Sequence, residues 1–290
     1  MTERLGDVEA RIGTVRQLSS VIGAMRGIAA VRSHEAAARL PGIHSYAATI
    51  GGAIARALML AAPAATAAVP LAATAAVPPA ATAAVPSTGL VIALCAEQGF
   101  VGPFTAHVLA AVPGCSALVV VGTRGLAPAH ERGLPVVATL TMVSHVDQIV
   151  ALTNRLADLV LARIAAEGLA RVTVVHAIPA ANGQPTAIVT TQLLPFDVAR
   201  FADARHAPPP IVQVPAARLV AQLADEYMFA QLCEALTLSF AAENEARMHA
   251  MVAARDNVAH KLDDLEASAR RLRQEAITAE VIELAASRDA

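Results

Sequence analysis

The last 75 residues of the chain, 216–290, contain neither glycine nor proline. Without such breakers they can form a single helix of about 110 Å at a rise of about 1.5 Å per residue. Small or apolar residues recur along this segment at a mean spacing of about 3.5, which predicts a left-handed coiled coil and therefore a second long helix beside it. These residues are Met251, Ala254, Val258, Leu262, Leu265, Ala269, Leu272, Ala276 and Ala279.

The first sixty residues are the natural partner for that helix. Apolar residues there recur every three or four positions, and the segment is net basic whereas residues 216–290 are net acidic. A kink is expected at Pro41-Gly42, with helix resuming from His44 to Met59. Because a folded segment intervenes, the two helices are expected to run antiparallel. The apolar stripe comprises Leu5, Val8, Ile12, Val15, Leu18, Ile22, Met25 and Ile28.

Residues 63–86 contain three copies of Ala-Ala-Thr-Ala-Ala-Val-Pro. Regular prolines at this spacing exclude one helix or a sheet ladder, so the segment is interpreted as a flexible low-complexity insert without a function of its own. No charged residue occurs from Ala57 to Ala96, but the prolines argue against a membrane span.

Between the insert and the last helix, buried strand patterns alternate with helical patterns. This alternation predicts an α/β domain with a Rossmann-like, mostly parallel sheet, to which residues 186–194 add an outer strand. The expected division is an N-terminal helix at 1–60, the insert at 61–88, the α/β domain at 89–215 and the C-terminal helix at 216–290. The predicted strands are 90–94, 117–121, 136–140 and 172–175, and the predicted helices are 101–112, 126–132 and 145–167.

Composition excludes several classes of function. A net charge of -2 and a pI near 6.5 argue against a nucleic-acid binder, which needs a surplus of basic residues on one face. Charged residues near the N-terminus are unlike a signal peptide, so a cytoplasmic protein is expected. Three scattered cysteines favour a reducing compartment and provide neither a disulfide framework nor a zinc site.

No motif for phosphate-loop, metalloprotease or dithiol chemistry occurs, so no catalytic, cofactor or metal site is predicted. Cys95, at the end of the first predicted strand, is the single candidate nucleophile, with Glu97 or His107 nearby. The simpler interpretation is a small buried cysteine beside a glycine turn. Residues 122–125 are likewise read as a tight turn rather than an anion nest. A Cys95-dependent hydrolase and a coiled-coil adaptor remain the alternative functions.

The most specific pattern in the chain is the run Glu-Ala-Arg-Met-His-Ala-Met-Val-Ala-Ala-Arg-Asp-Asn-Val at 245–258, followed by Arg-Gln-Glu-Ala-Ile-Thr at 273–278. With further stretches it resembles the gamma subunit of F-type ATP synthases over the whole chain except residues 63–86. Gln-Leu-Leu-Pro at 192–195 also matches. The opening helix is similar to the family at Arg11-Ile12, Val15, residues 22–25 and Ala29-Ala30.

Three departures accompany this resemblance. The family's Ser-Asp-Arg-Gly-Leu-Cys-Gly-Gly pattern is replaced by Cys-Ala-Glu-Gln-Gly-Phe-Val-Gly at 95–102, which removes that arginine. Arg26-Gly27 follows Met25 without the lysines common there, and the insert has no family counterpart. The departures suggest a divergent paralogue, with the alternative sodium-type N-ATPase group as the expected placement.

The resemblance implies a non-catalytic rotor shaft without cofactors, peripheral to the cytoplasmic face of the bacterial inner membrane. Its implied partners are the alpha and beta subunits, the epsilon subunit and the membrane c-ring. By position, Arg273, Gln274 and Thr278 are expected to reach the loops of the catalytic ring, with Arg247 and Met25 lower on the shaft. Asp225, Glu226 and Tyr227 are expected to meet the rotor ring or epsilon.

Overall fold

A computed structural model describes residues 5–60, 89–169, 171–180, 186–196 and 211–288, except the side chains of Met59 and residues 283–288. The predicted insert at 61–88 lies outside these residues. The chain divides into two compact units. Unit 1 contains residues 1–30 and 247–290, and unit 2 contains residues 31–246.

Both predicted long helices are present. Helix α1 spans Leu5–Leu60 and helix α6 spans Ala216–Arg288, which is 73 residues. Helix α1 continues without a break across Pro41 and Gly42, so the expectation that the helix resumes only at His44 is wrong. None of the helices in the described part of the chain is long and apolar enough to cross a membrane.

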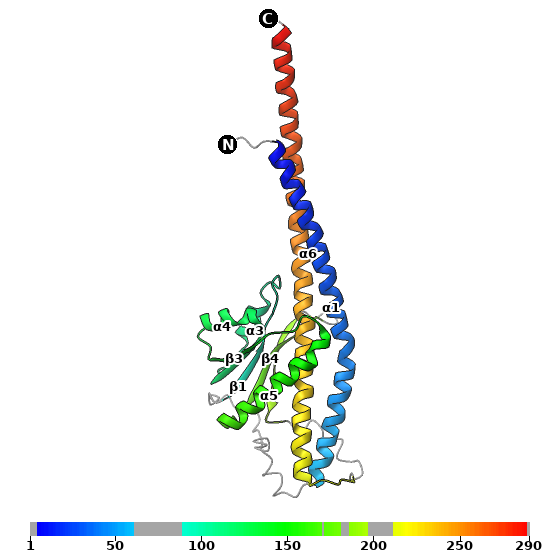
Figure 1. Cartoon of the computed structure of the whole chain (residues 1–290), viewed down its shortest axis with the longest axis vertical. Helices are drawn as coiled ribbons and strands as arrows, with labels where there is room; N and C mark the ends of the chain where they lie inside the picture. Colours follow the sequence, from blue (N-terminus) through cyan, green and yellow to red (C-terminus); the bar gives the residue numbers. More distant parts are fainter. Residues whose placement is uncertain (1–4, 61–88, 170, 181–185, 197–210, 289–290) are drawn as a thin grey trace. The chain divides into compact units, whose positions relative to one another are not determined.

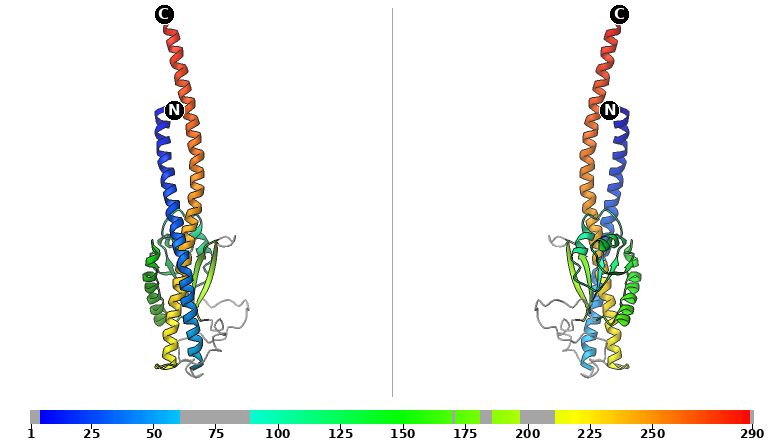
Figure 2. Two further views of the ribbon diagram at one scale, coloured as in Figure 1. Left: turned by 90° about the vertical axis from the view of Figure 1, so that its right-hand side faces the viewer. Right: turned by 90° about the vertical axis from the view of Figure 1, so that its left-hand side faces the viewer.

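In unit 1 the start of α1 packs against the later part of α6. The core of this pair consists of Val8 and Ile12 from α1 with Leu265 and Ala269 from α6. Exposed ion pairs flank it, because Arg16 lies 2.8 Å from Glu266 and Arg273 lies 2.7 Å from Glu9. Residues later in α1 therefore contact residues earlier in α6, which confirms the predicted antiparallel pairing. Figure 2 shows the two helices side by side in this unit.

Buried and half-buried residues follow a heptad repeat along the whole of α1. One series steps by seven residues from Val8 to Ala57, and a second is offset by four. A strict seven-residue repeat is the pattern of a left-handed coiled coil. Many of the positions hold alanine or serine, which lets helix backbones approach closely. The first series is Val8, Val15, Ile22, Ala29, Ala36, Ile43, Ile50 and Ala57; the second includes Ile12, Ser19, Ser33, Leu40, Ala47 and Ile54.

Four of the residues predicted to lie in the seam are instead exposed. On α1, Leu18 is 49% and Ile28 is 53% exposed, because the heptad phase assigns the seam to Ser19 and Ala29. On α6, Ala276 and Ala279 are exposed. They lie beyond Arg273, which already pairs with Glu9 in the second turn of α1, so no described turn of α1 covers them.

Unit 2 contains a five-stranded sheet with strand order β3-β2-β1-β4-β5. Strands β1 to β4 are parallel and β5 is antiparallel to β4, as predicted for a mostly parallel sheet with an added outer strand. Every residue of β1 and β2 is buried, which explains their continuous apolar sequences. The strands are β1 (Leu90–Leu94), β2 (Ala117–Val121), β3 (Val136–Leu140), β4 (Val172–Ile178) and β5 (Ala187–Leu194).

Helices cover both faces of this sheet (Figure 1). One face packs on α3 (Phe104–Ala110) and α4 (Leu126–Glu131). The other packs on α5 (Ile149–Glu167) and on α6, where Met228, Leu236 and Phe240 are almost completely buried. Short 3-10 turns, η1 (Thr123–Gly125) and η2 (Val146–Gln148), precede α4 and α5.

The helices α1 and α6 are also antiparallel within unit 2. His44 Nε2 lies 3.1 Å from Glu234 Oε1, and Tyr46 donates a hydrogen bond to Glu226. Further along α1, Ala57 packs against Val220. Unit 2 therefore combines an α/β sandwich with a helix pair that forms part of one of its layers.

Candidate interaction surfaces

The exposed end of α6 holds the residues expected to contact the catalytic ring. From Arg273 to Ile282 every residue is exposed, including Ile277 at 55% and Val281 at 59%. Arg273 pairs with Glu9, and Thr278 donates a hydrogen bond to the carbonyl of Gln274. The Gln274 side chain is exposed. These side chains are accessible to a partner, and their contact with the ring stays a prediction.

The two residues expected lower on the shaft differ in accessibility. Met25 is half-buried on α1. Arg247 is only 4% exposed and already interacts within the chain. This burial favours a role in packing within the chain over contact with a partner protein. Moving the guanidinium away from its present partners would leave a buried charge uncompensated.

The three residues of the expected foot have different surroundings. Asp225 is exposed, and Glu226 accepts the hydrogen bond from Tyr46. Burial and this carboxylate raise the pKa of Tyr46 to about 12. Burial and the neighbouring Glu226 also raise the pKa of Asp225. Tyr227 is buried, with its ring edge-on to Phe196 at a centroid distance of 5.7 Å. Contact between this segment and the rotor ring or epsilon stays a prediction.

The geometry around Cys95 favours a structural role. The residue is 1% exposed, and burial followed by the nearby Glu243 carboxylate raises the pKa of its thiol to about 12. A thiolate is the reactive form, so this thiol is unreactive near neutral pH. Gly125 lies against it so closely that an added Cβ would sit 2.6 Å from the sulfur. The interpretation as a buried cysteine beside a glycine turn fits this packing.

Glu97, considered above as a helper of Cys95, instead organises the turn. Its carboxylate accepts hydrogen bonds from the Thr123 amide, the Thr123 hydroxyl and the Met142 amide, at 3.1, 2.8 and 2.8 Å. It therefore holds together the segments that follow β1, β2 and β3.

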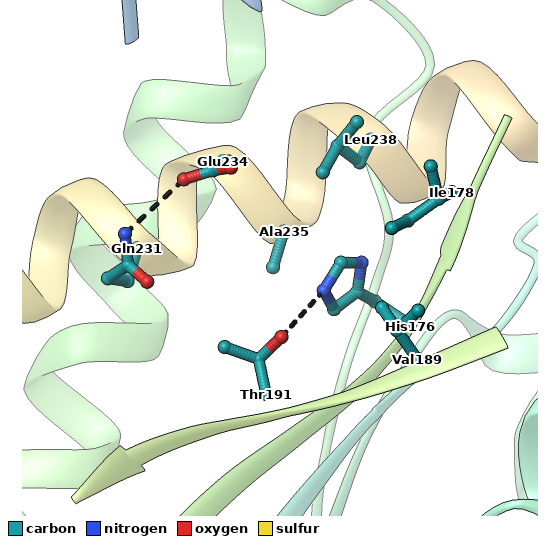
Figure 3. Close-up of a pocket in the computed structure, with 8 residues that line it drawn as sticks. All are labelled: His176, Ile178, Val189, Thr191, Gln231, Glu234, Ala235 and Leu238. Carbon is teal, nitrogen blue, oxygen red and sulfur yellow. Dashed lines mark hydrogen bonds between the residues drawn. The ribbon is translucent and has the colours of Figure 1, made fainter. Parts of the chain in front are cut away.

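A cavity of about 270 Å³ with both polar and apolar lining residues lies between β4, β5 and α6 (Figure 3). His176 is 4% exposed there, and its Nε2 lies 3.1 Å from the Thr191 hydroxyl. Burial lowers the pKa of this imidazole, partly offset by the backbone contact with Ala177. Across the cavity, Gln231 donates a hydrogen bond to Glu234. Sequence analysis missed this site, because an isolated histidine in a strand gives no indication of its neighbours.

No cluster of three or more metal-ligating side chains occurs among the residues that the structure describes.

Comparison with known proteins identifies the family. A family model described as ATP synthase matches residues 4–290, and the chain belongs to this ATP synthase family. Curated relatives are more specific. The ATP synthase gamma chain of Clostridium botulinum (strain Hall) is 32% identical over 105 residues, which is 36% of each chain. That of Geotalea daltonii is 34% identical over 97 residues, covering 33% of this chain and 34% of its own. The resemblance to the gamma subunit is thereby confirmed.

The chain spans about a third of the length of the curated relatives it matches. Solved structures extend the fold comparison to nearly the whole chain. A chain of the Euglena gracilis mitochondrial ATP synthase OSCP/F1/c-ring structure is 12% identical with a TM-score of 0.62, covering 98% of this chain and 93% of its own. A Tetrahymena thermophila mitochondrial central stalk/c-ring chain is 19% identical with a TM-score of 0.54, covering 81% and 99%. Identities this low establish the shared fold alone.

Proposed function

We propose that the chain is the central rotor-stalk (gamma) subunit of an F-type ATP synthase, coupling ion flow across the membrane to ATP synthesis or hydrolysis. The observation that carries the proposal is the antiparallel pairing of the chain's two ends in unit 1, in a chain of the ATP synthase family. Its partners are the alpha, beta and epsilon subunits and the c-ring. It lies peripherally at the cytoplasmic face of the bacterial inner membrane and contributes no catalytic group.

The mechanism follows from the asymmetry of unit 1. A pair of unlike helices has no threefold symmetry, so it cannot contact three equivalent catalytic subunits in the same way. Each orientation of the pair stabilises a different conformation at each catalytic site. That difference in contact free energy couples rotation to nucleotide chemistry. The exposed apolar and polar residues of α6 between Arg273 and Ile282 supply such contacts.

Replacing Arg273 and Gln274 together by alanine tests the contact with the catalytic ring. A desolvated interfacial arginine contributes about 2 to 5 kcal/mol by truncation, so we expect loss of ion-coupled ATP hydrolysis in the assembled complex. The matched control is Lys261→Ala, an exposed cation on the same helix. Turnover and coupling equal to the parent complex would remove these two residues from the interface.

Co-purification tests the assignment to the complex itself. A tagged chain should bring down alpha and beta subunits in stoichiometric amounts. Isolation of the chain alone, or with unrelated proteins, would favour the adaptor function. The placement in the sodium-type group stays a prediction, tested by whether sodium or protons drive the reconstituted complex.

A further inference from the structure

A second cavity, of about 330 Å³, lies at the ends of β1 and β2 in unit 2. It is lined by the loop at 98–102 and by Thr105, Arg124 and Arg132. The cavity lies at the carboxyl ends of these two neighbouring parallel strands, where the segments that follow them meet. In open α/β sheets, ligands bind outside the carboxyl ends of the strands. No role in the proposed stalk function uses this cavity.

The two arginines give the cavity a positive charge. Neither Arg124 nor Arg132 has an ion pair or side-chain hydrogen bond with any residue that the structure describes. Both are exposed. The nearest carboxylate in the turn, Glu97, does not line the cavity and is occupied by three hydrogen-bond donors. The cavity therefore presents two guanidinium groups without a compensating anion of its own.

The glycine loop supplies further donors. The Nη2 atom of Arg124 would lie 3.1 Å from a Cβ placed on Gly99, so the absence of a side chain there lets the guanidinium approach the loop. The amides of Phe100, Val101 and Gly102 have no hydrogen-bond acceptor within the described residues. Guanidinium groups and backbone amides without an acceptor are donors that bind phosphate oxygens.

Phe100 adds an aromatic surface to the same site. Phe100 as a residue is 65% exposed, and its backbone has a φ of 61°, a region that residues with a side chain rarely adopt. An exposed aromatic ring beside arginines can stack on a nucleobase, since every base has a π-face. We propose that this cavity binds the phosphate group of a small phosphorylated ligand. This ligand is a mononucleotide, and its base stacks on Phe100.

The proposal is tested by titrating the isotopically labelled full-length chain with inorganic phosphate, AMP and ATP, followed by amide NMR and calorimetry. We expect saturable shifts of the amides at 99–102 that weaken as ionic strength rises. Arg124→Gln or Arg132→Gln should each lower the affinity about tenfold or more, because each removes a charge-assisted contact. Arg155→Gln, an exposed arginine on α5 away from the cavity, should leave the affinity unchanged.

The three ligands distinguish the source of the phosphate. Tighter binding of AMP and ATP than of inorganic phosphate, lost selectively in Phe100→Leu, assigns the site to nucleotides. Equal binding of all three, unaffected by Phe100→Leu, assigns it to the phosphate group alone. Circular dichroism confirms that each variant is folded.

Three results would overturn the proposal. One is the absence of saturable shifts with all three ligands at millimolar concentration, and another is an equal loss of affinity in Arg155→Gln. The third is binding of a polyglutamate peptide without binding of any phosphate, which would assign the arginines to an acidic protein segment. None of these results bears on assembly with alpha and beta subunits, so the stalk function is tested separately.

Discussion

At the scale of single residues, the interior of unit 2 accommodates polar side chains by pairing them locally. Thr237 donates to the Cys233 carbonyl, Ser239 to the Leu94 carbonyl and Asn244 to the Phe240 carbonyl. Among the described residues no buried side-chain nitrogen or oxygen lacks a partner. The stretch of α6 that faces the sheet can therefore be polar in sequence without the desolvation penalty of unpaired groups.

His176 is the buried residue with the clearest dependence on pH. Burial lowers the pKa of its imidazole from the ordinary value of 6.5, so the unfolded chain takes up the proton first as the pH falls. The free energy of unfolding should therefore decrease below about pH 6.5, by at most about 1.4 kcal/mol per pH unit from this group. Denaturant titrations of His176→Gln between pH 7 and 5 should show a shallower decrease than the parent chain.

The matched control for this experiment is His130→Gln, which replaces an exposed ring on α4. It should leave the pH dependence of unfolding close to that of the parent chain. Identical slopes for His176→Gln and the parent would show that the buried imidazole does not contribute.

At the scale of elements, the heptad series of α1 depends on small residues. Ala36 is completely buried in the main core of unit 2, whereas its neighbour Ala37 is exposed. We expect Ala36→Leu to lower the free energy of unfolding by about 1 to 3 kcal/mol, because extra methyl groups have no space in a close-packed seam. Ala37→Leu should change it by less than about 0.5 kcal/mol. Equal effects in chemical denaturation would contradict the close packing.

The first three strands of unit 2 could be predicted to the residue because they are short runs of β-branched and aliphatic residues bounded by turns, whereas β4 extends three residues beyond the predicted 172–175. The predicted strands at 90–94, 117–121 and 136–140 match β1, β2 and β3. The seam of α1 was harder to predict, because apolar character favoured Leu18 and Ile28 whereas packing favoured the smaller Ser19 and Ala29. Apolar character alone therefore does not fix the heptad phase of the seam.

The candidate sites were predictable only where the signal is local. The contact residues at the end of α6 came from a continuous family motif, and their exposure is compatible with that role. The two cavities combine residues far apart in the chain, such as His176 with Glu234 or Gly99 with Arg132. A single sequence carries no indication of such distances, since they depend on the sheet order and the path of α6.

At the scale of the whole molecule, α6 continues past its last buried position. Ala269 is the last buried residue, and Leu272 the last half-buried one, among those described. Truncation after Leu272 should therefore lower the stability of unit 1 by less than about 1 kcal/mol, the contribution of an exposed ion pair such as Arg273 with Glu9. Hydrogen exchange of the α1 amides at 8–16 measures this stability.

Truncation after Lys261 is the informative comparison. It also removes Leu265 and Ala269, so Val8 and Ile12 lose their partners and become exposed. At about 1.5 to 3 kcal/mol for each large aliphatic side chain, the α1 amides should lose most of their protection. Equal protection in both truncated chains would show that α1 is stable without its partner.

The chain contains no tryptophan and only two tyrosines, Tyr46 beside Glu226 and Tyr227 beside Phe196. Both belong to unit 2. Intrinsic fluorescence is consequently a reporter of that unit alone, whereas far-ultraviolet dichroism is dominated by helices that belong to both. Divergence of the two optical signals during melting would reveal that unit 1 and unit 2 lose their structure in separate steps, without any label being attached.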